Sequence, residues 1–129
     1  MAKKILIIDD EMDTLNLLAT TLGLAGYITA KAVNGHEGIL QMTEFGPDVI
    51  ILDMMMPDQS GVEVLNNMKR IFSNPPPVVI FSARGGIEDM VEGMEAGAFK
   101  YLVKPVSRDK LLETVKSALA ASAGNPQRR

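Results

Sequence analysis

The sequence lacks cysteine and tryptophan, and His36 is its only histidine. Without thiols the chain can form neither a disulfide framework nor a zinc–thiolate site, and this composition suits a reducing compartment. Its apolar runs are far shorter than the ~20 residues that a membrane-spanning helix needs, and the first of them is too short for a signal peptide. The 13 basic and 16 acidic side chains leave a net charge of −3, which argues against bulk-charge binding to nucleic acid or an anionic membrane. We therefore expect a cytoplasmic protein with no membrane contact and no direct binding to nucleic acid.

Length and apolar content favour one folded domain. The chain has 129 residues, of which 47% are hydrophobic and 22% charged, as in ordinary globular proteins. Apolar periodicity does not extend into residues 124–129. We therefore expect a single domain over residues 1–123, followed by a polar tail or the start of a linker over residues 124–129.

Five short apolar blocks indicate five β-strands. Four of them are unbroken and rich in β-branched residues, which is typical of strands buried on both faces of a parallel sheet. The remaining block, residues 27–33, alternates between apolar and polar side chains and is expected at an edge of the sheet. The four buried blocks are residues 5–8, 49–52, 78–81 and 101–103.

Apolar stripes with helical spacing separate these strands. Asn34 lies three residues before Glu37, which is the spacing of an N-terminal cap. Ser60 and Glu63 form a clearer capping box, and Ser107 is expected to cap the last helix. The repeated alternation of strand and helix predicts a doubly wound α/β fold, a parallel five-stranded sheet with helices on both faces. The expected helices cover residues 12–25, 35–45, 60–72, 87–94 and 107–119.

The fourth expected helix has a stripe that allows two interpretations. Ile87, Met90, Val91 and Met94 recur at the spacing of one helix face. This spacing predicts a face that packs against the core. Methionine-rich helices also serve as adaptable docking surfaces, so that interpretation stays open.

Polar side chains follow four of the expected strands at the point where each strand ends. Asp9 and Asp10 follow the first strand, and Asp53 follows the third. Ser82 ends the fourth strand, and Lys104 follows the fifth. The C-terminal ends of parallel strands lie along one edge of the sheet, where open α/β folds bind their ligands. We therefore expect these five side chains to converge.

Three carboxylates at one edge predict a cation between them. Each ionised pair among Asp9, Asp10 and Asp53 would cost roughly 1–4 kcal/mol at ~4 Å, depending on the effective dielectric. Mg²⁺ suits one or two carboxylates with water and phosphate oxygens, whereas zinc or copper would lack their usual ligands in this chain. With Lys104 and Ser82 the cation would surround a phosphoryl group, for which Asp53 is the candidate nucleophile.

At these positions the sequence resembles the receiver domain of two-component response regulators. The resemblance extends from Lys4 to about Ala121 and includes Gly61. It implies a flavodoxin-like fold with the strand order 2-1-3-4-5. The matching fragments are Ile-Leu-Ile-Ile-Asp-Asp-Glu at 5–11, Asp-Met-Met-Met-Pro at 53–57, Ser-Ala at 82–83 and Lys-Pro at 104–105.

The resemblance implies a phosphoacceptor and a metal site. Asp53 would accept a phosphoryl group from a phosphohistidine of a sensor histidine kinase or a phosphotransfer protein. Mg²⁺ would be bound by Asp10, Asp53 and the backbone carbonyl of Met55, while Asp9 would help to hold the metal through water. The resemblance implies a chain that assists its own phosphorylation and the later hydrolysis of the phosphoryl group, but that is not a turnover enzyme.

The resemblance also implies a switch. Lys104 would pair with one phosphoryl oxygen, and Ser82 would move to form a hydrogen bond with another. Tyr101 would turn inward, which re-aims the surface made by the fourth helix, the fifth strand and the fifth helix. A downstream protein partner is expected to bind that surface. The peptide bond before Pro105 is expected to be cis.

Two other classes of function match parts of the pattern. A Mg²⁺-dependent phosphatase or phosphotransferase would also form an aspartyl phosphate, but Met55 stands where the Asp-x-Asp pattern of such enzymes has its acid/base carboxylate. A flavodoxin-like flavin carrier would need a phosphate-binding loop after the first strand, where acidic residues stand instead. Ser82 replaces the commoner Thr of receivers, and Met55 and Arg84 stand where that family tunes the lifetime of its phosphate.

The sequence has no second folded unit after about Ala121. We expect the chain either to act by direct protein contact or to be the receiver part of a longer protein whose effector follows.

Overall fold

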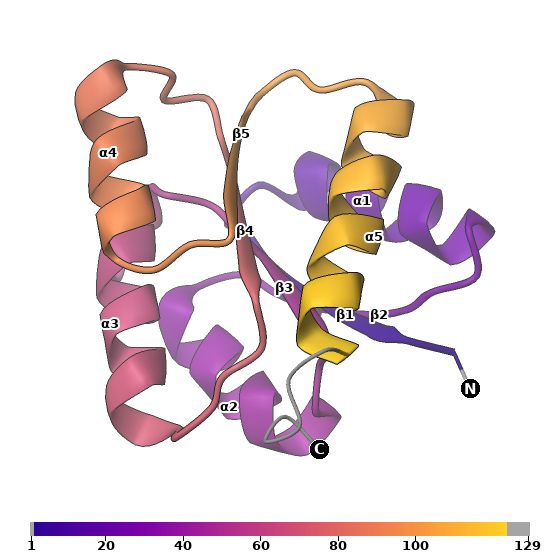
Figure 1. The fold of residues 1–129 in the computed structure, drawn as a ribbon, viewed down its shortest axis with the longest axis horizontal. Coiled ribbons are helices and arrows are strands. Elements are labelled where there is room, and N and C mark those ends of the chain that lie inside the picture. The colour runs from indigo at the N-terminus through magenta and orange to yellow at the C-terminus, as the bar shows by residue number, and fades with distance from the viewer. Residues whose placement is uncertain (1, 124–129) are drawn as a thin grey trace.

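A five-stranded parallel sheet runs through the middle of the molecule (Figure 1). The computed structural model describes residues 2–123, so the expected tail at 124–129 lies outside the described residues. The strands are β1 (Lys4–Ile8), β2 (Ile28–Ala32), β3 (Val49–Leu52), β4 (Val78–Ser82) and β5 (Lys100–Val103). All neighbouring pairs are parallel and their order is β2-β1-β3-β4-β5, which confirms the predicted topology.

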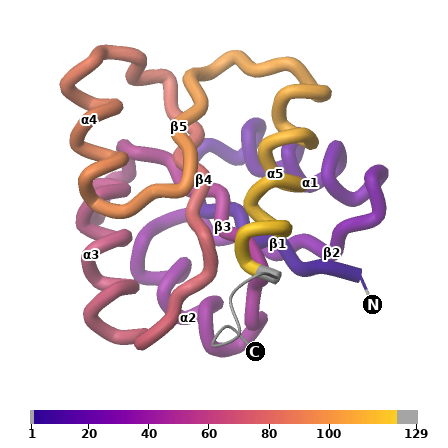
Figure 2. The backbone as a smooth tube through the Cα atoms, in the orientation of Figure 1, coloured from indigo at the N-terminus to yellow at the C-terminus, as the bar shows by residue number. Residues whose placement is uncertain are grey.

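Five helices alternate with the strands and cover both faces of the sheet. They are α1 (Met12–Leu24), α2 (Gly35–Phe45), α3 (Gly61–Ile71), α4 (Ile87–Glu95) and α5 (Arg108–Ala123). α1 and α5 lie together over one face, while α2, α3 and α4 lie over the other (Figures 1 and 2). The predicted doubly wound α/β fold is therefore confirmed.

The side chains of β1 show how the two faces are covered. Ile5 and Ile7 lie in the apolar cluster beneath α1 and α5, whereas Leu6 and Ile8 lie in the one beneath α2, α3 and α4. All four are fully buried. A strand with helices on both faces has no position that faces water, which explains its unbroken apolar block. β2 is exposed or partly exposed up to its last residue, Ala32, which is buried, and this suits the expected edge strand.

The predicted N-terminal caps are present. Asn34 accepts a hydrogen bond from the backbone N–H of Glu37 at 2.8 Å. Ser60 and Glu63 form the predicted capping box, and the hydroxyl of Ser107 accepts a backbone N–H from the first turn of α5. These short-range bonds supply partners for backbone donors that a helix leaves free at its start.

The boundaries around β2 differ slightly from the expected ones. The helix expected over 12–25 ends at Leu24, and the strand expected over 27–33 covers Ile28–Ala32. Gly26 lies between them with a φ of 98°, a conformation that L-residues with a side chain rarely adopt. The chain therefore turns over more residues than the apolar pattern indicated.

The prediction that the stripe of α4 faces the core is wrong for most of its members. Ile87 is 80% exposed, Val91 48% and Met94 44%, and Met90 alone of the stripe packs partly against the core. The residue of α4 that faces the sheet is Gly93, where a Cβ would come within 2.7 Å of a side-chain atom of β4. The helix thus approaches the sheet through a glycine, a residue that contributes nothing to an apolar pattern.

Gly61 lies where the chain closes tightly after β3. A Cβ at this position would lie 2.6 Å from the carbonyl oxygen of Asp53 and 2.9 Å from the Cα of Met54. The N–H of Gly61 also donates to the carbonyl of Met54 at 2.8 Å. Since both crowded neighbours are backbone atoms, no side chain can turn aside to admit a methyl group.

We predict opposite effects for one substitution at two glycines. Gly61→Ala is expected to lower the free energy of unfolding by about 1–3 kcal/mol, the usual cost of overpacking. Gly23→Ala is the matched control, because a Cβ there meets nothing within 4 Å and α1 would gain helix propensity of about 0.5–1 kcal/mol. Urea unfolding measures both, and a shift of the same sign in the two variants would contradict the packing at Gly61.

Candidate functional site

Backbone hydrogen bonds beyond the ends of β1 and β3 hold the acidic residues side by side. The N–H of Asp9 donates to the carbonyl of Ala32, and the N–H of Asp53 donates to the carbonyl of Ile8, each at 3.0 Å. At the other side of the site, the N–H of Lys104 donates to the carbonyl of Ser82 at 2.8 Å. The parallel ladder therefore continues past the strand ends and brings the predicted residues to one edge.

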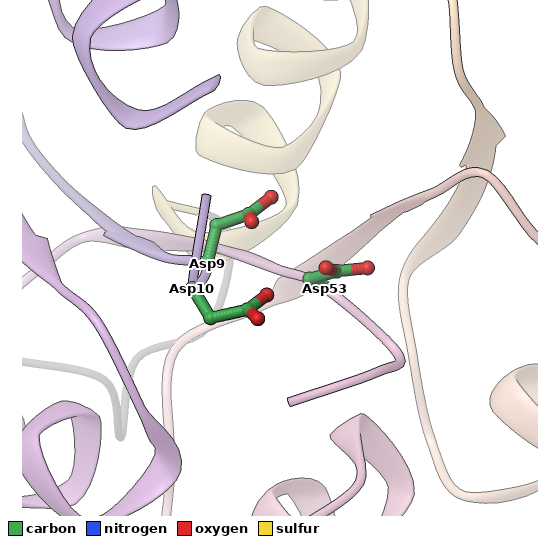
Figure 3. A group of neighbouring side chains, drawn as sticks. All are labelled: Asp9, Asp10 and Asp53. Atoms are coloured by element: carbon green, nitrogen blue, oxygen red, sulfur yellow. The ribbon is translucent and has the colours of Figure 1, made fainter. Parts of the chain in front are cut away.

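Three carboxylates converge at this edge, as predicted. Ligand atoms of Asp9, Asp10 and Asp53 all lie within 4.8 Å of one another. Figure 3 shows the side chains of Asp9 and Asp10 extending toward Asp53. Asp9 and Asp53 are buried and Asp10 is exposed, so the cluster has an inner and an outer part. Carboxylate oxygens in this arrangement are the donors that a hard divalent cation prefers.

The side chain of Lys104 brings a positive charge next to these carboxylates. Its Nζ lies 3.0 Å from Asp9 Oδ2, 3.6 Å from Glu11 Oε1 and 3.9 Å from Asp53 Oδ2. Burial by itself lowers the pKa of Lys104, but the hydrogen bond to Asp9 and the nearby carboxylates raise it above its ordinary value. Lys104 thus stays charged, and its closest partner here is Asp9 and not Asp53.

The surroundings of Asp53 disfavour its ionisation. Burial and, after it, the charge of Asp9 bring the pKa of this carboxyl from 3.8 up to about 6. Lys104 and the backbone amides of Met55 and Met54 act in the opposite direction. Lys104 therefore does not offset the combined effect of burial and of Asp9 on this carboxyl, and a further cation at this edge would favour the ionised form.

Ser82 and Tyr101 both bond to the backbone of Arg84. Ser82 Oγ accepts the N–H of Arg84 at 3.1 Å, and the hydroxyl of Tyr101 donates to the carbonyl of Arg84 at 2.6 Å. Both side chains are buried, and burial raises the pKa of the Tyr101 hydroxyl, which keeps it a donor. Arg84 also forms an ion pair with Asp89 of α4 at 3.5 Å. The backbone and side chain of Arg84 therefore connect the site to α4.

The site opens into a pocket of about 280 Å³. Sequence reasoning identified most of its lining, but it gave Glu11 no role beyond the motif, although Glu11 is an ion-pair partner of Lys104. The position directly after two acidic residues is the signal that could have marked it. His36 is exposed and does not line the pocket. The lining residues are Asp10, Glu11, Asp53, Met55, Ser82, Ala83, Arg84 and Lys104.

The peptide bond between Lys104 and Pro105, beside the site, is cis, as the resemblance implied.

Over residues 2–123 we find no helix with the length and apolar character needed to cross a membrane.

The raised pKa of Asp53 predicts a pH-dependent cost to stability. Since the folded pKa of about 6 exceeds 3.8, the cost is absent at pH values below 3.8, grows up to about pH 6 and is constant above that. Asp53→Asn is therefore expected to be more stable than wild type at pH 7 without divalent cations. A gain of about 1–2 kcal/mol remains after solvent screening is allowed for.

Urea unfolding in EDTA between pH 4 and pH 8 measures this difference. Asp10→Asn removes a carboxylate from the exposed part of the same cluster, and this control is expected to give a smaller gain. Equal stabilities of wild type and Asp53→Asn at every pH would contradict the account.

The chain matches the family model described as response regulator receiver domain over residues 5–116. It is 42% identical over 116 residues to the transcriptional regulatory protein PrrA of Mycobacterium bovis, covering 90% of this chain and 49% of that protein. It is 34% identical over 120 residues to the phosphate regulon transcriptional regulatory protein PhoB of Escherichia coli, covering 92% of this chain and 52% of that protein. The chain thus spans about half the length of these curated relatives.

Solved structures agree with the family match. A response regulator receiver domain protein from Clostridium thermocellum is 33% identical with a TM-score of 0.86, covering 94% of this chain and 97% of that one. The chemotaxis protein CheY4 of Vibrio cholerae is 30% identical with a TM-score of 0.84, covering 92% and 100%. The sequence match and the shared fold together establish that this chain belongs to the response regulator receiver domain family, the phosphoacceptor switches of two-component signalling.

Proposed function

We propose that this chain is a signalling switch that accepts a phosphoryl group on Asp53. The observation that carries the proposal is the convergence of Asp53 with Asp9, Asp10 and the ammonium of Lys104 at one sheet edge. A carboxylate oxygen of Asp53 would bond to phosphorus while the bond from phosphorus to the donor's imidazole nitrogen breaks. The electron pair of that bond stays on the nitrogen.

The donor set fits Mg²⁺, which this family generally uses. Asp10 and Asp53 would hold the ion with the backbone carbonyl of Met55, and Asp9 would help through water. The bound ion supplies positive charge beside the phosphoryl oxygens. Burial and then the charge of Asp9 raise the pKa of Asp53, so a cation beside this carboxyl would favour its ionised form.

Lys104 and Ser82 would bind the phosphoryl oxygens. The Nζ of Lys104, now 3.0 Å from Asp9 and 3.9 Å from Asp53, needs only a small movement to meet a group on Asp53. Ser82 would turn its hydroxyl toward the phosphoryl group and lose its hydrogen bond from Arg84. Since Tyr101 also bonds to the backbone of Arg84, the signal would pass through that residue to the start of α4.

We propose two kinds of partner. A sensor histidine kinase or a phosphotransfer protein would supply the phosphoryl group in the cytoplasm. A downstream protein would bind the face formed by α4, β5 and α5, where Ile87, Val91 and Met94 expose apolar surface. The net charge of −3 supports an output through protein contact and not through direct nucleic-acid binding by this domain, which we take to cover residues 1–123.

The alternative of a turnover phosphatase lacks support in the site. Met55 occupies the position where an acid/base carboxylate would stand, and its side chain cannot move a proton. We therefore propose that the chain assists the transfer of a phosphoryl group to itself and the hydrolysis of that group, and that it is not a turnover enzyme.

Incubation with acetyl phosphate and Mg²⁺, followed by intact mass spectrometry, tests the proposal. Wild type is expected to gain one phosphoryl group, and Asp53→Asn is expected to gain none because the nucleophile is absent. Asp13→Asn, which removes an exposed carboxylate of α1, is the matched control and should be modified like wild type. Modification of Asp53→Asn would contradict the acceptor assignment, and sustained turnover of acetyl phosphate would favour the phosphatase.

A further inference from the structure

The free backbone donors at the start of α2 are satisfied by two different parts of the chain. Asn34, the N-cap, accepts the N–H of Glu37 at 2.8 Å. The N–H groups of Gly35 and His36 donate instead to Asp58, one to each carboxylate oxygen and each at 3.0 Å. Asp58 belongs to the loop between β3 and α3, so this loop supplies part of the cap of a neighbouring helix.

The bond between Asp58 and α2 is built as a charged cap. Slight burial by itself raises the pKa of Asp58, but the amides of Gly35 and His36 hold it below its ordinary value. The carboxylate also lies at the positive end of the α2 dipole, which favours an anion there. Asp58 is therefore ionised at neutral pH and accepts with both oxygens.

The neighbouring residue Gln59 fixes the same stretch of loop. A Cβ on Gly35 would lie 2.5 Å from Gln59 Cγ, so the absence of a side chain at Gly35 lets the loop lie against the start of α2. The side-chain carbonyl of Gln59 accepts a hydrogen bond from the amide of Asn67 in α3 at 2.9 Å. At its base the loop is closed by the bond from Gly61 to Met54.

Met55 lies in this loop between the base and the point held by Asp58. Its side chain is half exposed, and Met56 beside it packs partly against the core. Pro57 and Asp58 are exposed, so apolar burial does not hold this outer part of the loop in place. The outer part therefore depends mainly on polar bonds, among them the bidentate bond from Asp58 to α2.

We propose that Asp58 is a positioning residue for the metal: by tying the β3–α3 loop to α2, it holds the backbone carbonyl of Met55 where the ion needs it. This inference rests on the proposed function, in which that carbonyl is a ligand. A ligand that is already ordered costs less to bind, because the ordering has been completed on folding. Asp58 acts through the loop and does not itself touch the ion.

The test is a titration of the whole chain with MgCl₂ at physiological ionic strength. Calorimetry measures the Mg²⁺ affinity, and NMR monitors the backbone amide signals of Gly35 and His36. Asp58→Ala is expected to release both amides and to weaken Mg²⁺ binding roughly tenfold, the lower end of the range for residues that orient metal ligands. Asp58→Asn, which loses the charge but keeps one acceptor oxygen, is expected to fall between Asp58→Ala and wild type.

Asp48→Ala is the matched control. Asp48 also accepts one backbone N–H through its carboxylate, from Lys4 at 2.8 Å, but at the opposite end of β1 and β3. This variant is expected to bind Mg²⁺ like wild type. If Asp58→Ala releases the two amides but binds Mg²⁺ with wild-type affinity, this inference is wrong while the proposed function stands. The same follows if Asp58→Ala, Asp58→Asn and Asp48→Ala weaken Mg²⁺ binding equally. Failure of the wild-type chain to bind Mg²⁺ would overturn the proposed function as well.

Discussion

Repulsion among carboxylates at one edge of the sheet is the constraint on which the rest of the site depends. β1 and β3 are adjacent, and the hydrogen bond from Asp53 to Ile8 continues their ladder past the strand ends. The acidic residues therefore cannot separate without breaking the centre of the fold. Lys104, which follows β5, offsets part of the repulsion, while burial and then the charge of Asp9 keep the pKa of Asp53 raised. The fold thus maintains an electrostatic demand for a further cation.

The surroundings of this cluster differ on its two sides. On the side of α2, the β3–α3 loop is tied down by Asp58 and by the tight closure at Gly61. On the side of α4, Ser82 accepts the N–H of Arg84 and Tyr101 donates to its carbonyl, two bonds that the proposed switch would exchange for other partners. We infer that the first side holds ligands in place while the second responds to charge. A switch needs both, because a signal passes on only if one part moves relative to another.

Much of the fold and of the site could be predicted from local patterns. The strand ends identified Asp9, Asp53 and Lys104, since parallel strands carry their C-terminal residues to one edge. The orientation of α4 could not be predicted, because its contact with the sheet is made by Gly93 and no apolar side chain marks that position. The bond of Asp58 to α2 joins residues 22 and 23 positions apart, so no short-range spacing indicates it. The pairing of Lys104 with Asp9 likewise depends on side-chain packing.

We propose that this edge of the sheet holds a metal ion and a phosphoryl group on Asp53 together. A crystal structure of the chain with Mg²⁺ and beryllium fluoride, which stands in for the phosphoryl group, tests it most directly. We expect beryllium bonded to a carboxylate oxygen of Asp53, Lys104 Nζ in contact with a fluoride, and Mg²⁺ about 2.0–2.1 Å from oxygens of Asp10, Asp53 and Met55. Beryllium fluoride bound elsewhere, or an ion that Asp10 and Asp53 do not touch, would contradict it.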